Sequence, residues 1–123
     1  MSQTLAIAAG GAVGALLRYW ISLFVYSLMG RGFPYGTLVV NVLGSLLMGY
    51  LFVVFIERLA SDALWRAALL VGVLGAFTTF STFSIETVNL IEDGAYTKAL
   101  VNVILSVLLC VSAAWAGVIL GRQ

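Results

Sequence analysis

The chain has 123 residues, of which 63% are hydrophobic, and it carries only six basic and five acidic side chains. A soluble domain is roughly 45–50% apolar and about 25% charged, so a chain with 9% charged residues cannot cover its surface with solvated groups. This composition excludes an ordinary soluble domain, a nucleic-acid-binding protein and a disordered tail. The chain has no histidine and one cysteine, which also excludes a metal cage of imidazoles or thiolates and a disulfide framework. We therefore expect an integral membrane protein.

Long uncharged runs mark the expected membrane-spanning helices. Residues 32–56, 67–85 and 99–121 carry no charge, and each run is long enough to cross a hydrocarbon core of about 30 Å as a helix. The first thirty residues carry one charge, Arg18, and predict a fourth helix; a signal peptide fits poorly because no basic segment precedes the apolar stretch. The sequence thus predicts an all-α membrane protein with one four-helix transmembrane domain over residues 1–123. The predicted spans are about 4–28, 36–56, 67–90 and 98–120.

Three short connections, Met29–Tyr35, Glu57–Arg66 and Ile91–Thr97, join these helices, and their charges give almost no orientation signal. Four crossings place both termini and the second connection on one side of the membrane. That side carries three arginines, whereas the other side carries Arg31 and Lys98, which is hardly a positive-inside bias. Two interpretations stay open. Either another signal sets a single orientation, or the chain has dual topology, inserting both ways and pairing antiparallel with itself.

Every predicted helix carries small residues at four-residue spacing, which lets helix backbones approach closely. These residues are Gly10 and Gly14, Ser45 and Gly49, Gly72 and Ala76, and Ala113, Gly117 and Gly121. Packing between helices explains most of them. Four helices make a poor container for a transport pathway, however, so we also expect a homodimer, which would supply eight.

Two polar side chains inside the predicted spans need an explanation. Arg18 lies well inside the first helix, where a central arginine costs about 2.5–3.5 kcal/mol on insertion scales. It either extends toward the interface or has a structural or electrostatic role inside the assembly. Asn41 lies early in the second span, and its amide either bonds a neighbouring helix or donates to a dehydrated anion.

The third span contains the least ordinary segment, GVLGAFTTFSTFSIE over residues 72–86. Its two glycines and five hydroxyl side chains predict a helix break near Gly75–Thr78, which membranes tolerate only where the backbone is buried in protein or lines a cavity. Such a break frees carbonyl oxygens for a cation and hydroxyl groups as donors. Phe77, Phe80 and Phe83 recur every three residues and predict one ladder. The rings are either apolar filler or, through their positive edges, anion contacts.

The fourth span carries a mildly polar stripe of Asn102, Ser106 and Cys110, explained equally well by packing hydrogen bonds or by a pathway wall. Cys110 is interpreted as a small hydrophobe. Glu86 ends the uncharged run of the third span and is interpreted as a solvated carboxylate at a helix end. No nucleophile has a base beside it in the sequence, so we do not expect an enzyme.

Three segments, GGAVGALLRY (10–19), NVLGS (41–45) and GAFTTFSTFSIE (75–86), resemble the Fluc/CrcB fluoride channel family. The resemblance covers the whole chain in length, number of spans and order of motifs. It implies a dual-topology antiparallel homodimer in the bacterial inner membrane. Such a dimer contains two pores and passively conducts fluoride out of the cytoplasm. The partners implied are a second copy of the chain, fluoride and membrane lipid.

The resemblance also implies roles for individual residues. Phe80 and Phe83 match the two phenylalanines whose ring edges line the fluoride path, and Asn41 matches the pore asparagine. Gly75 and Thr78 match the break whose backbone carbonyls hold a structural sodium ion that is not transported, and Arg18 matches the arginine of the first helix. A path for a small, tightly hydrated anion needs neutral donors that release it readily. The expected fluoride pathway is Asn41, Phe80, Ser81, Thr82, Phe83, Asn102 and Ser106.

Two rival interpretations remain. A small proton-coupled multidrug transporter also has four helices and dual topology, but it needs an intramembrane carboxylate, and the first helix carries Arg18 instead. A non-transporting membrane subunit would account for the small-residue faces. It would leave the hydroxyl and phenylalanine cluster of the third span without a purpose.

Overall fold

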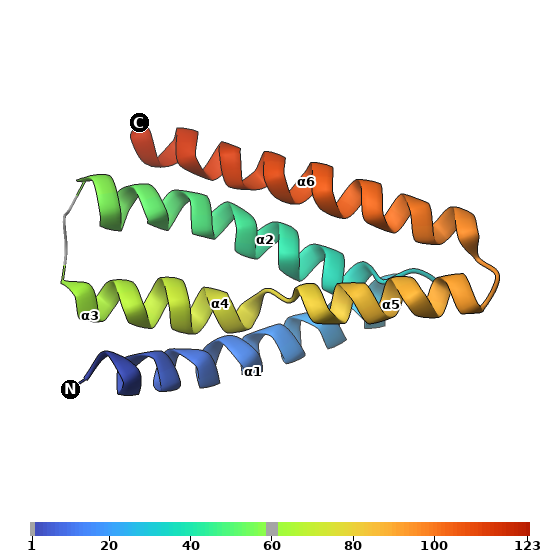
Figure 1. Ribbon diagram of the computed structural model, residues 1–123, viewed down its shortest axis with the longest axis horizontal. Helices are drawn as coiled ribbons and strands as arrows, with labels where there is room; N and C mark the ends of the chain where they lie inside the picture. The colour runs from blue at the N-terminus through green and yellow to red at the C-terminus, as the bar shows by residue number, and fades with distance from the viewer. Residues whose placement is uncertain (1, 59–61) are drawn as a thin grey trace.

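The computed structural model describes residues 2–58 and 62–123, which form four long antiparallel helical segments (Figure 1). The first is α1 (Gln3–Met29), and the second is α2 (Tyr35–Phe52), continued by the π-helical turn η1 (Val53–Arg58). The third consists of α3 (Ala63–Arg66), the π-helical η2 (Ala67–Val73), α4 (Leu74–Phe77) and α5 (Phe80–Glu92); the fourth is α6 (Tyr96–Arg122). All four segments are long and apolar enough to cross a membrane. The all-helical class and the four apolar helices are confirmed.

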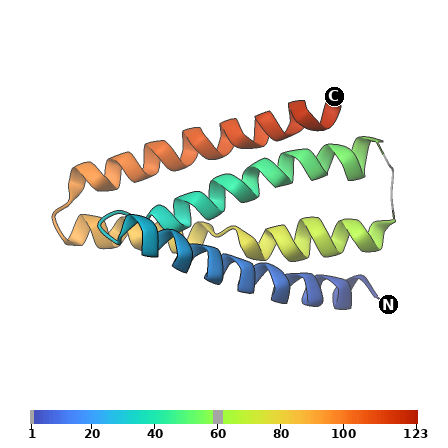
Figure 2. The same cartoon turned by 180° about the vertical axis from the view of Figure 1, so that it is seen from behind.

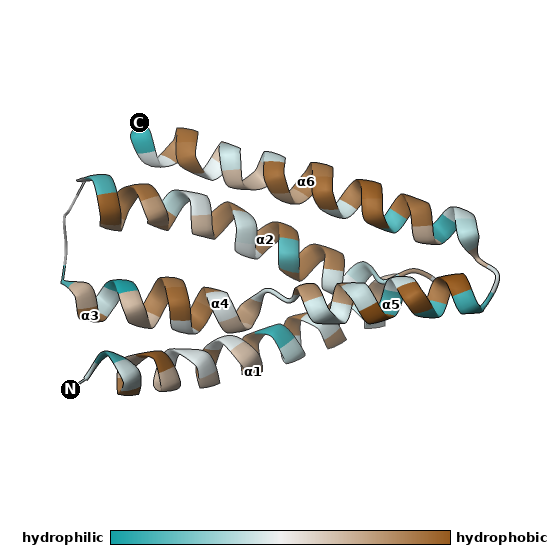
Figure 3. Ribbon diagram, viewed as in Figure 1, coloured by the Kyte–Doolittle hydropathy of each residue, from teal (hydrophilic) through white to brown (hydrophobic). Residues whose placement is uncertain are grey.

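Both termini lie at one end of the bundle, together with the ends of η1 and α3 (Figures 1 and 2). The middle of the predicted Glu57–Arg66 connection, residues 59–61, lies outside the described residues. At this end Arg122 donates to Glu57 at 2.8 Å, which joins the end of α6 to η1. At the opposite end the Lys98 ammonium donates to the Gly32 carbonyl at 3.0 Å. Hydropathy follows the same arrangement, with apolar residues along the helices and many of the polar ones toward their ends (Figure 3).

Glycines bring the helices together within one chain. A Cβ added at Gly14 of α1 would collide with the Val73 carbonyl, and one at Gly49 of α2 would collide with the Ala114 carbonyl of α6. Gly10 and Gly117 are in equally close contact with backbone carbonyls. The small-residue faces therefore pack α1 against the η2 region and α2 against α6.

Much of the remaining apolar surface faces outward. On α6, Leu108, Val111 and Trp115 are 59%, 64% and 70% exposed. A water-soluble monomer rarely leaves so continuous an apolar face uncovered, whereas lipid or a second membrane chain covers it at no cost. The exposed surface thus agrees with the membrane location indicated by the four apolar helices.

The third segment is interrupted at Thr78 and Thr79, which are both extended, with φ and ψ of −87° and 157° and of −152° and 118°. The predicted break is confirmed and lies at the end of the predicted Gly75–Thr78 interval. The ladder of three phenylalanines is wrong, because a ladder needs a continuous helix and Phe77 belongs to α4, before the break. Only Phe80 and Phe83 stay paired, with ring centroids 5.2 Å apart.

Candidate functional site

The break is joined to α2 by two hydrogen bonds between Asn41 and Thr79. The Thr79 N–H donates to Asn41 Oδ1 at 2.8 Å, and Asn41 Nδ2 donates to the Thr79 carbonyl at 3.0 Å. Because a backbone N–H only donates, the amide atom facing it must be the oxygen. Asn41 therefore bonds the neighbouring helix segment, as one of its two interpretations held, and Nδ2 carries a second N–H.

The Thr79 side chain begins α5. Its Oγ1 accepts from the Thr82 N–H at 3.1 Å, which is the geometry of a helix N-cap, and donates to Thr82 Oγ1 at 3.0 Å. Ser81 Oγ lies 3.3 Å from the same hydroxyl. Three of the hydroxyl groups predicted to be donors are thus engaged with one another at the first turn of α5.

Arg18 reaches the other side of the break. Its Nε donates to the Ala76 carbonyl at 3.2 Å, so the guanidinium joins the middle of α1 to the last turn of α4. This contact favours the structural interpretation of Arg18 over simple extension toward the interface.

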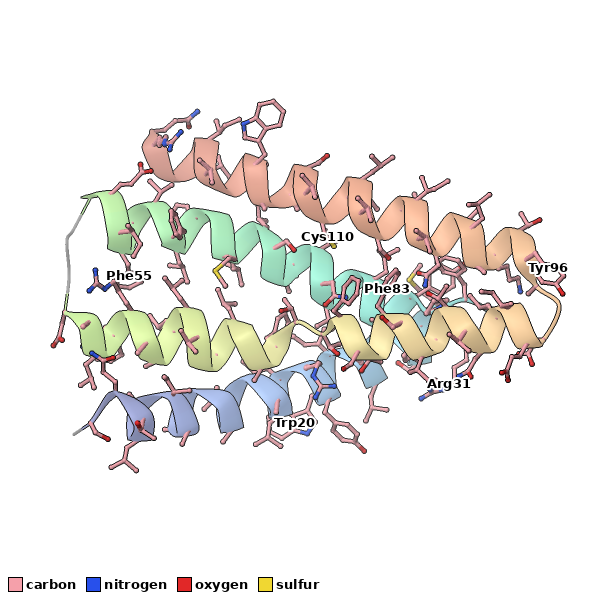
Figure 4. The ribbon with its side chains drawn as sticks, in the orientation of Figure 1. Trp20, Arg31, Phe55, Phe83, Tyr96 and Cys110 are labelled. Atoms are coloured by element: carbon pink, nitrogen blue, oxygen red, sulfur yellow. The ribbon has the colours of Figure 1, made fainter. Side chains whose placement is uncertain are left out.

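A cavity of about 390 Å³ lies beside the break, between α2, α5 and α6. Four residues of the predicted pathway line it together: Asn41, Phe80, Phe83 and Ser106. Cys110 is also in its wall and points from α6 toward α2, as Figure 4 shows. The cavity therefore combines an amide, four hydroxyl-bearing residues and two aromatic rings with apolar walls, and no charged side chain of the described residues lines it.

Three residues of the predicted pathway lie elsewhere. Ser81 is exposed, and Thr82 lines a second cavity of about 270 Å³ together with Arg18. Asn102 is only 1% exposed and donates to Thr87 Oγ1 at 2.9 Å. The structure thus does not place these three side chains in the cavity that holds the others.

Residues 5–118 match the family model described as CrcB-like protein, Camphor Resistance (CrcB). The chain belongs to the CrcB-like family. Its relatives include proteins named fluoride-specific ion channel FluC from Methylococcus capsulatus, 58% identical over 118 residues, and from Coxiella burnetii, 56% identical over 122 residues. A third relative of that name, from Magnetococcus marinus, is 54% identical over 116 residues.

The extent of these matches differs between relatives. The CrcB-like chain spans about half of the Methylococcus protein (52%), with 96% of its own residues matched. It spans 98% of the Coxiella protein and 94% of the Magnetococcus protein. Two of these three relatives are thus matched over nearly their whole length.

The break of this CrcB-like chain also suits a small alkali cation. Unwound backbone carbonyls in broken membrane helices are typical sodium ligands, because they are neutral oxygen donors fixed at mid-membrane depth. Gly75 lies within α4 and Thr78 directly follows it, and the extended conformation of Thr78 turns its carbonyl out of the helical direction. Both predicted donors are thus neutral carbonyl oxygens, which is the type of ligand that a sodium ion takes.

Two features of the site were not predicted from the sequence. The capping role of Thr79 could have been predicted, because threonine is a preferred N-cap residue directly before a helical run. The Tyr26 hydroxyl donates to Glu86 Oε2 at 3.1 Å, and the Arg31 guanidinium lies 4.5 Å from the Tyr26 ring centroid. Glu86 is thus not simply a solvated carboxylate. No local pattern connects residues 60 positions apart, so this pair was not predictable.

Proposed function

We propose that this chain is a fluoride-selective channel that passively exports fluoride across the bacterial inner membrane. The observation that carries the proposal is the cavity at the helix break, which is lined by neutral donors and two aromatic rings and by no charged side chain of the described residues. Fluoride is small and tightly hydrated, so short-range donors must replace its water. A fixed cation in the wall would bind it too tightly for conduction. The relatives named fluoride-specific ion channel FluC support the same activity.

Each residue of the expected pathway has a role in the proposal. Asn41 supplies its remaining N–H and Ser106 its hydroxyl, while Phe80 and Phe83 present their ring edges to the anion. Ser81 and Thr82 offer hydroxyls at the first turn of α5. Asn102 acts next to the path by accepting from Ser106 Oγ at 3.5 Å.

The functional unit proposed is an antiparallel, dual-topology homodimer with two pores. Phe80 is 76% exposed although it lines the cavity, so a single chain leaves the proposed path open on one side. The apolar surface of the bundle supplies an area that a second copy could cover. Helices of the second copy, packed against the break of the first, would then close the open side of the first chain's path.

Sodium is proposed as a structural ion held by the Gly75 and Thr78 carbonyls of both chains. When bound, it places a fixed positive charge between the two pores, which favours anions over cations. Arg18 stabilises the same region by holding the Ala76 carbonyl. Conduction involves no bond making or breaking, so the proposal assigns no enzymatic step.

Fluoride efflux from liposomes that contain the purified protein tests the proposal, with chloride as the matched anion. We expect fluoride efflux at least about a hundredfold faster than chloride efflux, because the path desolvates only a small anion. Absence of fluoride-selective efflux would refute the channel. Proton-driven uptake of a cationic dye would instead support the transporter, and inactivity in both assays would support the non-transporting subunit.

A further inference from the structure

Two backbone N–H groups at the break donate to side chains instead of to the helix. In a continuous α-helix the Gly75 carbonyl accepts from the Thr79 N–H, and the Thr78 carbonyl accepts from the Thr82 N–H. Here the Thr79 N–H donates to Asn41 Oδ1 at 2.8 Å, and the Thr82 N–H donates to Thr79 Oγ1 at 3.1 Å. Both carbonyls therefore lose their helical donors.

In this arrangement both backbone N–H donors, those of Thr79 and Thr82, still have a hydrogen-bond acceptor. A backbone N–H inside a membrane must have a partner, and without a side-chain oxygen it returns to the nearest carbonyl. Asn41 and Thr79 supply those side-chain oxygens. The two N–H groups are thus bonded while the two carbonyl oxygens remain available, and the extended Thr78 and Thr79 keep the helix from closing.

We propose that Asn41 and Thr79 are positioning residues for the cation site, because each captures the N–H that would otherwise occupy a ligand carbonyl. The inference rests on the proposed function, in which Gly75 and Thr78 hold sodium. Asn41 then has a second role besides lining the cavity. Thr79, which is not among the predicted pathway residues, also gains a role.

Three variants separate capture of an N–H from simple loss of a hydroxyl. Thr79→Val keeps the shape of the side chain but removes the acceptor for the Thr82 N–H, whereas Thr79→Ser keeps that acceptor. Thr82→Val is the matched control, since Thr82 Oγ1 accepts from Thr79 but captures no backbone N–H. For each purified protein, the melting temperature is measured as sodium replaces N-methylglucamine at constant ionic strength.

We expect Thr79→Val to raise the sodium concentration for the half-maximal melting shift by about tenfold or more, the effect of losing roughly one hydrogen bond. Thr79→Ser and Thr82→Val should stay within about threefold of the wild type. An unchanged midpoint in Thr79→Val, or an equal loss in Thr82→Val, would overturn the inference. Absence of any sodium-dependent shift in the wild type would also overturn it.

A measurement on the wild type does not depend on the folding of a variant. Because side chains hold the Thr79 and Thr82 N–H groups, both should be protected from hydrogen exchange in sodium-free buffer as well as with sodium. Protection that appears only with sodium would overturn the inference. The thermal and exchange readouts need no transport, so missing fluoride efflux would refute the proposed function without deciding this inference.

Discussion

Asn102 of α6 donates through Nδ2 to Thr87 Oγ1 of α5 at 2.9 Å, with its side chain 1% exposed. The Thr87 hydroxyl in turn donates to the Phe83 carbonyl at 2.8 Å. These bonds continue from α6 through α5 to the residue whose ring lines the cavity. A buried amide in this position fixes how α6 lies against α5, whichever ion the cavity carries.

Replacing Asn102 should therefore reduce stability more than it reduces anion selectivity. Asn102→Leu, of similar size, should lower the free energy of unfolding by about 1–3 kcal/mol, because a buried hydrogen bond is lost. Thr87→Val should cost a similar amount, and the double variant less than the sum of both, since one bond is shared. Denaturant unfolding of the four proteins measures this coupling. Full stability of Asn102→Leu with loss of fluoride selectivity would place the amide directly in the path.

Replacing the two paired rings, Phe80 and Phe83, should have different structural effects and similar transport effects. Phe83 is 9% exposed and Phe80 is 76% exposed. Phe83→Ile should lower stability by about 1 kcal/mol, and Phe80→Ile should leave the fold of the single chain unchanged. Both should lower fluoride efflux, because isoleucine keeps the apolar bulk but lacks a positive ring edge. Wild-type efflux from both variants would mean that the rings are only filler.

Two glycines of α1, Gly14 and Gly11, provide a matched pair. A Cβ at Gly14 collides with the Val73 carbonyl, whereas a Cβ at Gly11 meets no atom of the described residues within 4 Å. Gly14→Ala should cost about 1–3 kcal/mol through overpacking. Gly11→Ala should be neutral or stabilise by up to about 1 kcal/mol, as alanine favours a helix interior. Thermal unfolding of both variants checks the difference; equal melting temperatures would contradict the close approach of α1 and η2.

Arg18 should not be replaceable by lysine. Its Nε bond to Ala76 uses the planar guanidinium, and a lysine ammonium on a flexible stem cannot occupy the same position. Arg18→Lys should lower stability by about 1.5–3 kcal/mol, the usual range for a hydrogen bond to a charged group. Arg18→Met, of comparable length, controls for loss of charge. If the lysine variant unfolds like the wild type, the charge alone matters and the bond does not.

Charge placement predicted the four helices well, because the membrane interior excludes charge so strongly that uncharged runs mark the spans. The break was predictable for a similarly local reason, namely adjacent glycines and threonines in one span. What stabilises the break was not predictable. The partner of Thr79 lies on another helix at Asn41, and that of Ala76 is Arg18. Such contacts depend on how helices lie side by side, which no periodicity in one segment encodes.

The polar residues of α6 show the same limit. Asn102 and Ser106 are one turn apart and looked equivalent in sequence, yet Ser106 lines the cavity while Asn102 is buried against Thr87. The stripe lies on the face of α6 that meets α5 and the cavity. Which member of the stripe meets another helix depends on where α5 begins, and that is set by the break.

The interruption at Thr78 and Thr79 has an electrostatic consequence. A helix concentrates partial negative charge at its carboxyl end and partial positive charge at its amino end, normally far apart at the two membrane surfaces. Here α4 ends at Phe77 and α5 begins at Phe80, so both poles occur three residues apart, part-way along the third segment. The dipoles of one stretch of backbone thus present attraction for a cation and for an anion side by side, and Arg18 is the ionised group bonded to it.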